Sequence, residues 1–133
     1  MKFLTVLLAT TLLGACGTNS SDESRVRELI DAVEEAAESR DASDVLEHVA
    51  ADYSDAQGFD KTQLQNFLRG YFLANPKIEL LVGVDEIEFP VAGLGRARVD
   101  LTSLPAGDRV TLQVEFRELD GQWRVARADR VRE

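Results

Sequence analysis

The sequence Val110-Thr-Leu-Gln-Val-Glu-Phe-Arg117 decides the fold of the C-terminal half, because apolar and polar residues alternate strictly along it. This period-two pattern predicts a β-strand with one buried face and one solvated face. Asp120-Gly121 follows shortly after, and an Asp-Gly pair between alternating runs is a strong hairpin signal. Trp123 and Val125 then continue the apolar face. The stretch 110–125 therefore predicts a β-hairpin covered on one side.

The same alternation extends upstream of this hairpin, through strands whose apolar residues are Ile78, Leu80, Val82, Val84, Ile87, Phe89, Val91, Ala97, Val99 and Leu101. A phase slip at Asp85-Glu86 predicts a β-bulge. Gly93-Leu94-Gly95 and Pro105-Ala-Gly-Asp108 have the composition of turns between strands. We therefore expect a four-strand antiparallel meander in the C-terminal half.

Helical periodicity occupies the N-terminal half and predicts helices over about residues 24–39, 43–50 and 61–75. The third helix has the clearest start, because Asp60 followed by Gln63 matches a capping box. Its apolar face consists of Leu64, Phe67, Leu68, Tyr71 and Phe72. Helices followed by an antiparallel meander predict a single α+β domain over residues 24–133.

Four segments, by their order and spacing, resemble the nuclear-transport-factor-2-like superfamily, the cone-shaped fold of ketosteroid isomerases, scytalone dehydratase and polyketide cyclases. These segments are Arg40-Asp-Ala-Ser43, Ala51-Asp-Tyr-Ser-Asp55, Gly58 to Phe72, and Gly121-Gln-Trp-Arg-Val125. The resemblance implies N-terminal helices packed in a curved antiparallel four-strand sheet. It also implies a pocket at the open end of the cone.

Asp55 is the sharpest catalytic candidate, because it falls near the general-base carboxylate of the ketosteroid isomerases. A carboxylate in an apolar cavity can shuttle a proton, but aspartate is also a turn residue that bonds its own backbone. The resemblance places an oxyanion hole on the first helix and on a late strand. Val33 lies near the first place, and Glu115 lies on the charged face of its strand. Without both donors that reaction is disfavoured.

His48 is the second catalytic candidate and the only histidine. Dehydratase-like members use a histidine with an aspartate, and Asp52 lies four residues later, where the two side chains could pair on a helix. The alternative is a boundary histidine capped by that acid. The candidates for lining a pocket are Tyr53, Asp55, Phe67, Tyr71 and Trp123, of which the tyrosines and the tryptophan could equally fill the core.

A metal or cofactor site is not expected from this sequence. One histidine and one cysteine cannot build a zinc site. Asp52, Asp55 and Asp60 have the wrong spacing for a calcium loop. Gly93-Leu94-Gly95 is no nucleotide fingerprint, because no helix follows it.

The N-terminus carries Leu13-Gly14-Ala15-Cys16, which resembles the lipobox of bacterial lipoproteins. Lys2 and the apolar run Phe3–Leu13 precede it, and this run is shorter than the ~20 residues that span a bilayer. The resemblance implies a signal peptide over residues 1–15, lipidation of Cys16, and a flexible tether to residue 23. The alternative is an ordinary secretory signal with a chance cysteine. Gly17 after the cysteine implies the periplasmic face of the outer membrane, if the source is Gram-negative.

Charge is uneven, with 13 acidic and 3 basic residues in 17–60 and 11 of each in 61–133. Such an acidic chain has no electrostatic drive toward nucleic acid. The acidic segment predicts either a solvated face or a docking face for a basic partner.

We therefore expect a lipid-anchored cell-envelope protein that acts as a non-catalytic ligand-binding or protein-interaction module. The expected partners are a small apolar ligand or an envelope protein, and a second copy through the sheet. The alternative is a small isomerase, dehydratase or cyclase that acts on an apolar metabolite through Asp55 or His48.

Overall fold

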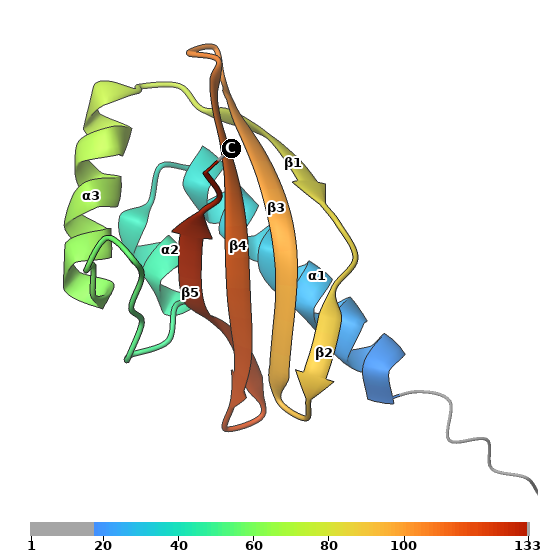
Figure 1. The fold of residues 1–133 in the computed structure, drawn as a ribbon. Coiled ribbons are helices and arrows are strands. Elements are labelled where there is room, and N and C mark those ends of the chain that lie inside the picture. Colours follow the sequence, from blue (N-terminus) through green and yellow to red (C-terminus); the bar gives the residue numbers. More distant parts are fainter. Residues whose placement is uncertain (1–17, 133) are drawn as a thin grey trace, which may run out of the picture.

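The computed structural model describes residues 18–132, which form three helices and five strands (Figure 1). The expected signal peptide and Cys16 lie outside the described residues. None of the described helices is long and apolar enough to cross a membrane. The elements in chain order are α1 (Thr18–Glu38), α2 (Ala42–Glu47), α3 (Lys61–Ala74), β1 (Glu79–Val84), β2 (Glu88–Val91), β3 (Leu94–Leu104), β4 (Asp108–Leu119) and β5 (Gln122–Arg130).

The strands form one antiparallel sheet in the order β1-β3-β4-β5, and β2 also pairs with β3. β3 and β4 make the central hairpin, whose register runs from Leu94 opposite Arg117 to Ser103 opposite Asp108. Figure 1 shows α1 passing behind the curved sheet, and α3 packs against α2 at one side of the sheet. The expected α+β class, with helices packed in a curved antiparallel sheet, is confirmed.

The expected number of four strands was wrong, because the sheet has five. The segment predicted as the first strand forms two strands, β1 and β2. β1 and β2 pair one after the other with the same long strand, β3. The phase slip at Asp85-Glu86 marks the break between them rather than a bulge within one strand. Each piece keeps its own alternation, so the pattern resumes with a new phase after the break.

Two helix boundaries also differ from the sequence prediction. Residues 18–23, expected in the tether, are the first residues of α1, and Glu23 forms an i,i+4 ion pair with Arg27 at 3.0 Å. α2 ends at Glu47 instead of Ala50. The chain leaves the helix there because Val49 pairs in parallel with Val125 of β5. Residues 48–50 thereby cover the outer edge of β5.

The predicted capping box at the start of α3 and the predicted hairpin turn at Asp120-Gly121 are confirmed. Asp60 accepts a hydrogen bond from the backbone N–H of Gln63 (2.9 Å), and the Gln63 side chain accepts one from the N–H of Asp60 (3.0 Å), which is the predicted capping box. Asp120 and Gly121 have φ values of 52° and 77°, as a type I′ hairpin turn requires.

The end of α1 carries a backbone feature that the sequence did not reveal. Arg40 adopts a left-handed conformation with φ of 55°, which glycine usually occupies at this position. Its N–H donates to the carbonyl of Ala37 (3.0 Å), and the N–H of Asp41 donates to that of Ala36 (3.1 Å). These bonds form a Schellman motif. The Arg40 guanidinium donates to the carbonyl of Phe72 in α3 (3.1 Å), so this turn ties α1 to α3.

Two hydrophobic clusters fill the space between helices and sheet. The first joins α1 to the sheet through Val26, Leu29, Ile87, Ala97, Val99, Val114, Phe116 and Trp123. The second joins the three helices through Ala36, Ala42, Val45, Leu46, Val49, Tyr53, Phe72 and Ile78. Trp123 packs edge-on against Phe89, with ring centroids 5.8 Å apart. The concave side of the sheet is therefore a packed core.

Candidate functional site

Asp55 lies in the loop between α2 and α3, and hydrogen bonds occupy both of its carboxylate oxygens. Oδ1 accepts from the backbone N–H groups of Gln57 (2.9 Å) and Phe59 (3.1 Å). Oδ2 accepts from the hydroxyl of Tyr53 (2.9 Å). Bonds from a carboxylate to the backbone two and four residues ahead are those of a turn residue. The geometry thus favours the turn alternative over a free general base.

Tyr53 is a buried member of the core, and it connects this loop to β5. Its hydroxyl, whose single proton points to Asp55 at the shorter distance, also lies 3.4 Å from the carbonyl oxygen of Ala128. Burial, together with the neighbouring Asp55 carboxylate, raises the pKa of Tyr53. A phenol with a raised pKa stays protonated and serves as a donor.

Asp129 of β5 closes the same network from the other side. Its carboxylate accepts from the N–H of Ala56 (2.7 Å) and from Arg127 (2.5 Å). Burial raises the pKa of Asp129, but these two donors outweigh burial, so the net shift is downward. Asp55 therefore bonds within the loop, and Asp129 ties the loop to β5.

The two positions expected for an oxyanion hole hold no donor that faces the interior. Val33 packs against both hydrophobic clusters. Glu115 lies on the outer face of the sheet, 3.7 Å from Arg96 of the neighbouring strand. The prediction from strand parity is confirmed for Glu115.

The expected pairing of His48 with Asp52 was wrong. α2 ends before His48, so the two side chains no longer share a helical face. Asp52 instead binds Arg117 of β4 at 2.6 Å, and this bond holds the pKa of Asp52 below its usual range. A strand residue 65 positions away is a partner that helical spacing cannot predict.

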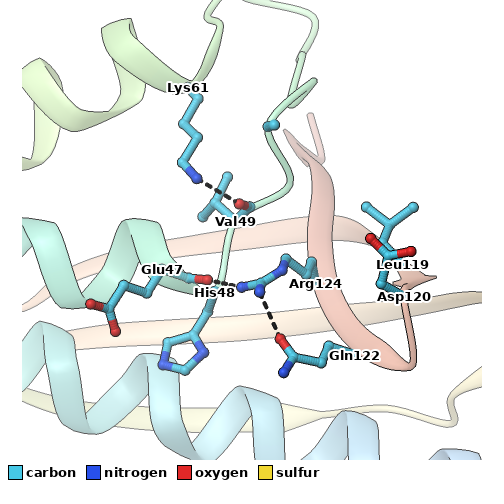
Figure 2. Close-up of a pocket in the computed structure, with 9 residues that line it drawn as sticks. Glu47, His48, Val49, Lys61, Leu119, Asp120, Gln122 and Arg124 are labelled. Atoms are coloured by element: carbon cyan, nitrogen blue, oxygen red, sulfur yellow. Dashed lines mark hydrogen bonds between the residues drawn. The ribbon is translucent and has the colours of Figure 1, made fainter.

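His48 lines a hollow of about 650 Å³ at the outer edge of β5 (Figure 2). Lys61 donates to the carbonyl of Val49 (2.9 Å), and Arg124 donates to the carbonyl of Glu47 and to the side chain of Gln122. Cations that bind the last carbonyls of a helix act as C-terminal caps. Arg124 therefore caps α2, whereas Lys61 binds the segment that follows the helix.

A second hollow of about 550 Å³ lies between the α1–α2 turn and α3, and Arg40, Arg69 and Leu73 are among its lining residues. Both hollows border the second hydrophobic cluster, because Val49 lines the first hollow and Ala42 and Phe72 line the second. Sequence reasoning missed them, because each is assembled from segments that are distant in sequence. None of the expected pocket-lining residues, Tyr53, Asp55, Phe67, Tyr71 and Trp123, lines either hollow.

Those five residues divide between the core, the loop and the surface of α3. Tyr53 and Trp123 are buried, as the core alternative predicted. Phe67 is 48% exposed and lies between Phe59 and Tyr71, with ring centroids 6.0 and 6.4 Å away. The structure therefore does not bring the five together around one cavity.

Within residues 18–132, no three or more histidine, cysteine or acidic side chains gather in a way that could hold a metal ion.

No family model and no curated protein matches the chain. Solved structures do resemble it. An NTF2-like protein of unknown function from Shewanella baltica aligns with a TM-score of 0.70 and 14% identity, over 86% of this chain and 96% of its own. One from Pseudomonas putida aligns with a TM-score of 0.69 and 19% identity, over 88% and 90%. A cystatin-like domain of unknown function from Nostoc punctiforme aligns with a TM-score of 0.69 and 16% identity, over 86% and 78%.

These likenesses show an NTF2-like, or cystatin-like, α+β fold, with five strands in place of the expected four. Ligand-binding and enzymatic proteins share this fold, and a fold alone does not choose between them.

Proposed function

We propose that this chain is a lipid-anchored protein of the bacterial cell envelope whose domain is a non-catalytic interaction module. The observation that carries the proposal is the state of Asp55, whose two carboxylate oxygens accept three hydrogen bonds within its own loop. A general base must present a lone pair to the substrate proton at hydrogen-bond distance. Three of the about four acceptor positions of the Asp55 carboxylate are therefore taken by the backbone of the turn and by Tyr53.

The filled interior supports the same proposal. Side chains of α1, α2 and α3 meet those of the sheet in two packed clusters. Small-molecule sites are concave and bury most of the ligand surface. The two hollows described above lie on the outside instead, where they suit contact with a macromolecule better than enclosure of an apolar metabolite.

The alternative is a small isomerase, dehydratase or cyclase that uses Asp55 or His48. It would need a base that faces a substrate cavity. His48 lines the same hollow as Arg124, which caps α2, and its expected acidic partner binds Arg117. The enzyme is therefore the weaker proposal.

The anchor rests on the lipobox-like segment Leu13-Gly14-Ala15-Cys16, outside the described residues. Because α1 begins at Thr18, only Gly17 separates its first residue from Cys16 in the sequence. A domain held by so short a connection would lie close to the membrane, with the N-terminus of α1 toward the lipid. Two or more acyl chains on one cysteine give lasting attachment, since each buried CH₂ contributes ~0.8 kcal/mol.

Cys16→Ser tests the anchor, since the chain has no other cysteine to acylate. We expect the variant to lose palmitate labelling and to leave the membrane fraction on carbonate washing. Equal labelling of the variant and the wild type would contradict lipidation at this residue.

Asp55→Ala tests the non-catalytic role through stability. Loss of three accepted hydrogen bonds should cost about 2–3 kcal/mol of unfolding free energy, while Asp55→Asn, which keeps the turn bonds, should cost less than about 1 kcal/mol. Residues held for catalysis are often destabilising, so their removal tends to raise stability. Urea unfolding measures both variants. An Asp55→Ala variant as stable as the wild type would favour the enzyme.

A further inference from the structure

β1 is an edge strand of the sheet. β1 stands at the end of the strand order, with β3 as its strand neighbour (Figure 1). The other end of the sheet is covered, because Val49 pairs with Val125 of β5. An open edge presents unpaired N–H and C=O groups and is a template for another strand.

The hydrogen-bond pattern shows which groups of β1 point outward. The N–H of Asp85 donates to the carbonyl of Arg98 (3.0 Å), in register with the β1–β3 ladder. Hydrogen-bonded pairs recur at every second residue of an antiparallel ladder, so the odd-numbered residues of β1 face β3. The backbone groups of Leu80 and Val82 therefore face away from the sheet. In agreement, the N–H of Leu80 donates to the carboxylate of Glu38 (3.2 Å).

The same residues are complementary to a second copy of themselves. We propose that two copies of this chain pair through β1, antiparallel, with Leu81 opposite Leu81 of the second copy. In this register Leu80 lies opposite the second copy's Val82, and both present outward backbone groups. Lys77 lies opposite Asp85, so each end of the pairing gains one pair of opposite charges.

Neighbouring in-phase registers are less favourable. A shift of two residues in one direction places Glu79 opposite Asp85, two carboxylates face to face. A shift in the other direction places Lys77 opposite Gly83, and the charge pair is lost. The proposed register alone keeps the charges matched and the two leucines together.

Leu81 gives the pairing its apolar contact. Its side chain is 59% exposed on the outer face of the sheet. Directly opposite residues that are not hydrogen-bonded to each other lie closest, with Cα atoms ~4.5 Å apart. The two Leu81 side chains would cover each other, and the outer face would continue from one copy into the next.

Glu38 sets the strength of this association. Its carboxylate accepts a hydrogen bond from the N–H of Leu80, and this N–H would have to donate to the second copy in the paired state. Pairing must displace the carboxylate, which gives a reversible dimer rather than a permanent one. Glu38→Ala should therefore tighten the dimer.

Disulfide trapping tests the register. In the full chain carrying Cys16→Ser, in mild detergent, Leu81→Cys provides the single cysteine, placed opposite itself. We expect oxidised glutathione to produce a covalent dimer. The matched control is Gln113→Cys, an exposed position on the same outer face but on β4. Cross-linking at residue 113 in preference to 81 would show that the copies meet face to face, and would overturn the edge pairing.

Charge exchange tests the same contact without cysteines. In sedimentation equilibrium, Lys77→Asp should weaken self-association roughly tenfold, because two attractive pairs become repulsive. Adding Asp85→Lys to that variant should restore it to within about threefold of the wild type. A wild-type chain that remains monomeric up to about 1 mM, or a double variant as weak as the single one, would overturn the proposal.

Discussion

Arg40 should tolerate glycine better than alanine, the reverse of the order at an ordinary helical residue. Its φ of 55° lies in the left-handed region, which costs an L-residue about 1–2 kcal/mol. Glycine removes this cost. It also gives the unfolded chain more conformational freedom, which lowers the unfolding free energy by about 0.4–1 kcal/mol. The net difference should be about 0.5–1 kcal/mol of unfolding free energy in favour of Arg40→Gly over Arg40→Ala.

Both variants also lose the bond from the guanidinium to the carbonyl of Phe72 (3.1 Å), which is part-buried. Because Arg40 is an exposed residue, this bond should contribute about 1–1.5 kcal/mol, as an ordinary hydrogen bond does. Arg40→Ala should therefore lose about 1–1.5 kcal/mol, and Arg40→Gly about 0.5 kcal/mol. In a domain of this size 1 kcal/mol moves the melting temperature by roughly 4–6 °C.

Urea unfolding of the two variants, at an unchanged m-value, measures the difference. Arg69 provides the matched control, because it is an exposed arginine in the middle of α3. There glycine should be worse than alanine by about 1 kcal/mol. A glycine variant at residue 40 that is less stable than the alanine variant would refute the strain argument.

Three further perturbations test the core, the network around Tyr53 and the helix cap. Trp123→Ala should cost about 3–5 kcal/mol in urea unfolding, because a buried aromatic leaves a cavity; Trp123→Phe should cost much less, since the indole N–H has no partner among the described residues. Burial and Asp55 raise the pKa of Tyr53, so above pH ~10 the unfolded chain loses a proton that the folded chain keeps. Stability should therefore fall as pH rises above ~10, by up to ~1.4 kcal/mol per pH unit, and Tyr53→Phe should flatten this fall in pH-dependent melting curves. Asp60→Ala should cost about 1 kcal/mol through loss of the capping box, and an unchanged melting temperature would contradict that role.

Local patterns predicted most of the fold, because they depend on neighbours in sequence. Alternation from Ile78 onward gave the strands, Asp120-Gly121 the hairpin, and Asp60 with Gln63 the start of α3. The break between β1 and β2 was misread as a bulge. A phase slip looks the same in both cases, and only the shared partner strand β3 distinguishes them.

The candidate site was less predictable, because its partners are far apart in sequence. Asp52 binds Arg117, and Tyr53 reaches the carbonyl of Ala128, 75 residues away. Helical spacing pointed to His48 as the partner of Asp52, but pairing with β5 ends α2 before that residue. The turn role of Asp55 depends only on residues close in sequence. The hydrogen bonds from the N–H groups of Gln57 and Phe59 support it.

The parallel bridge between Val49 and Val125 limits how far a sheet of this kind can grow. A strand edge that accepts a neighbour on both sides leads to open-ended polymers, as in fibrils. Here the segment 48–50 covers β5 at Val125, and the proposed pairing about a two-fold axis would engage β1 on the other side. If the copies pair in this way, assembly through β1 would stop at two copies, and the segment 48–50 would hinder addition of a further strand at β5.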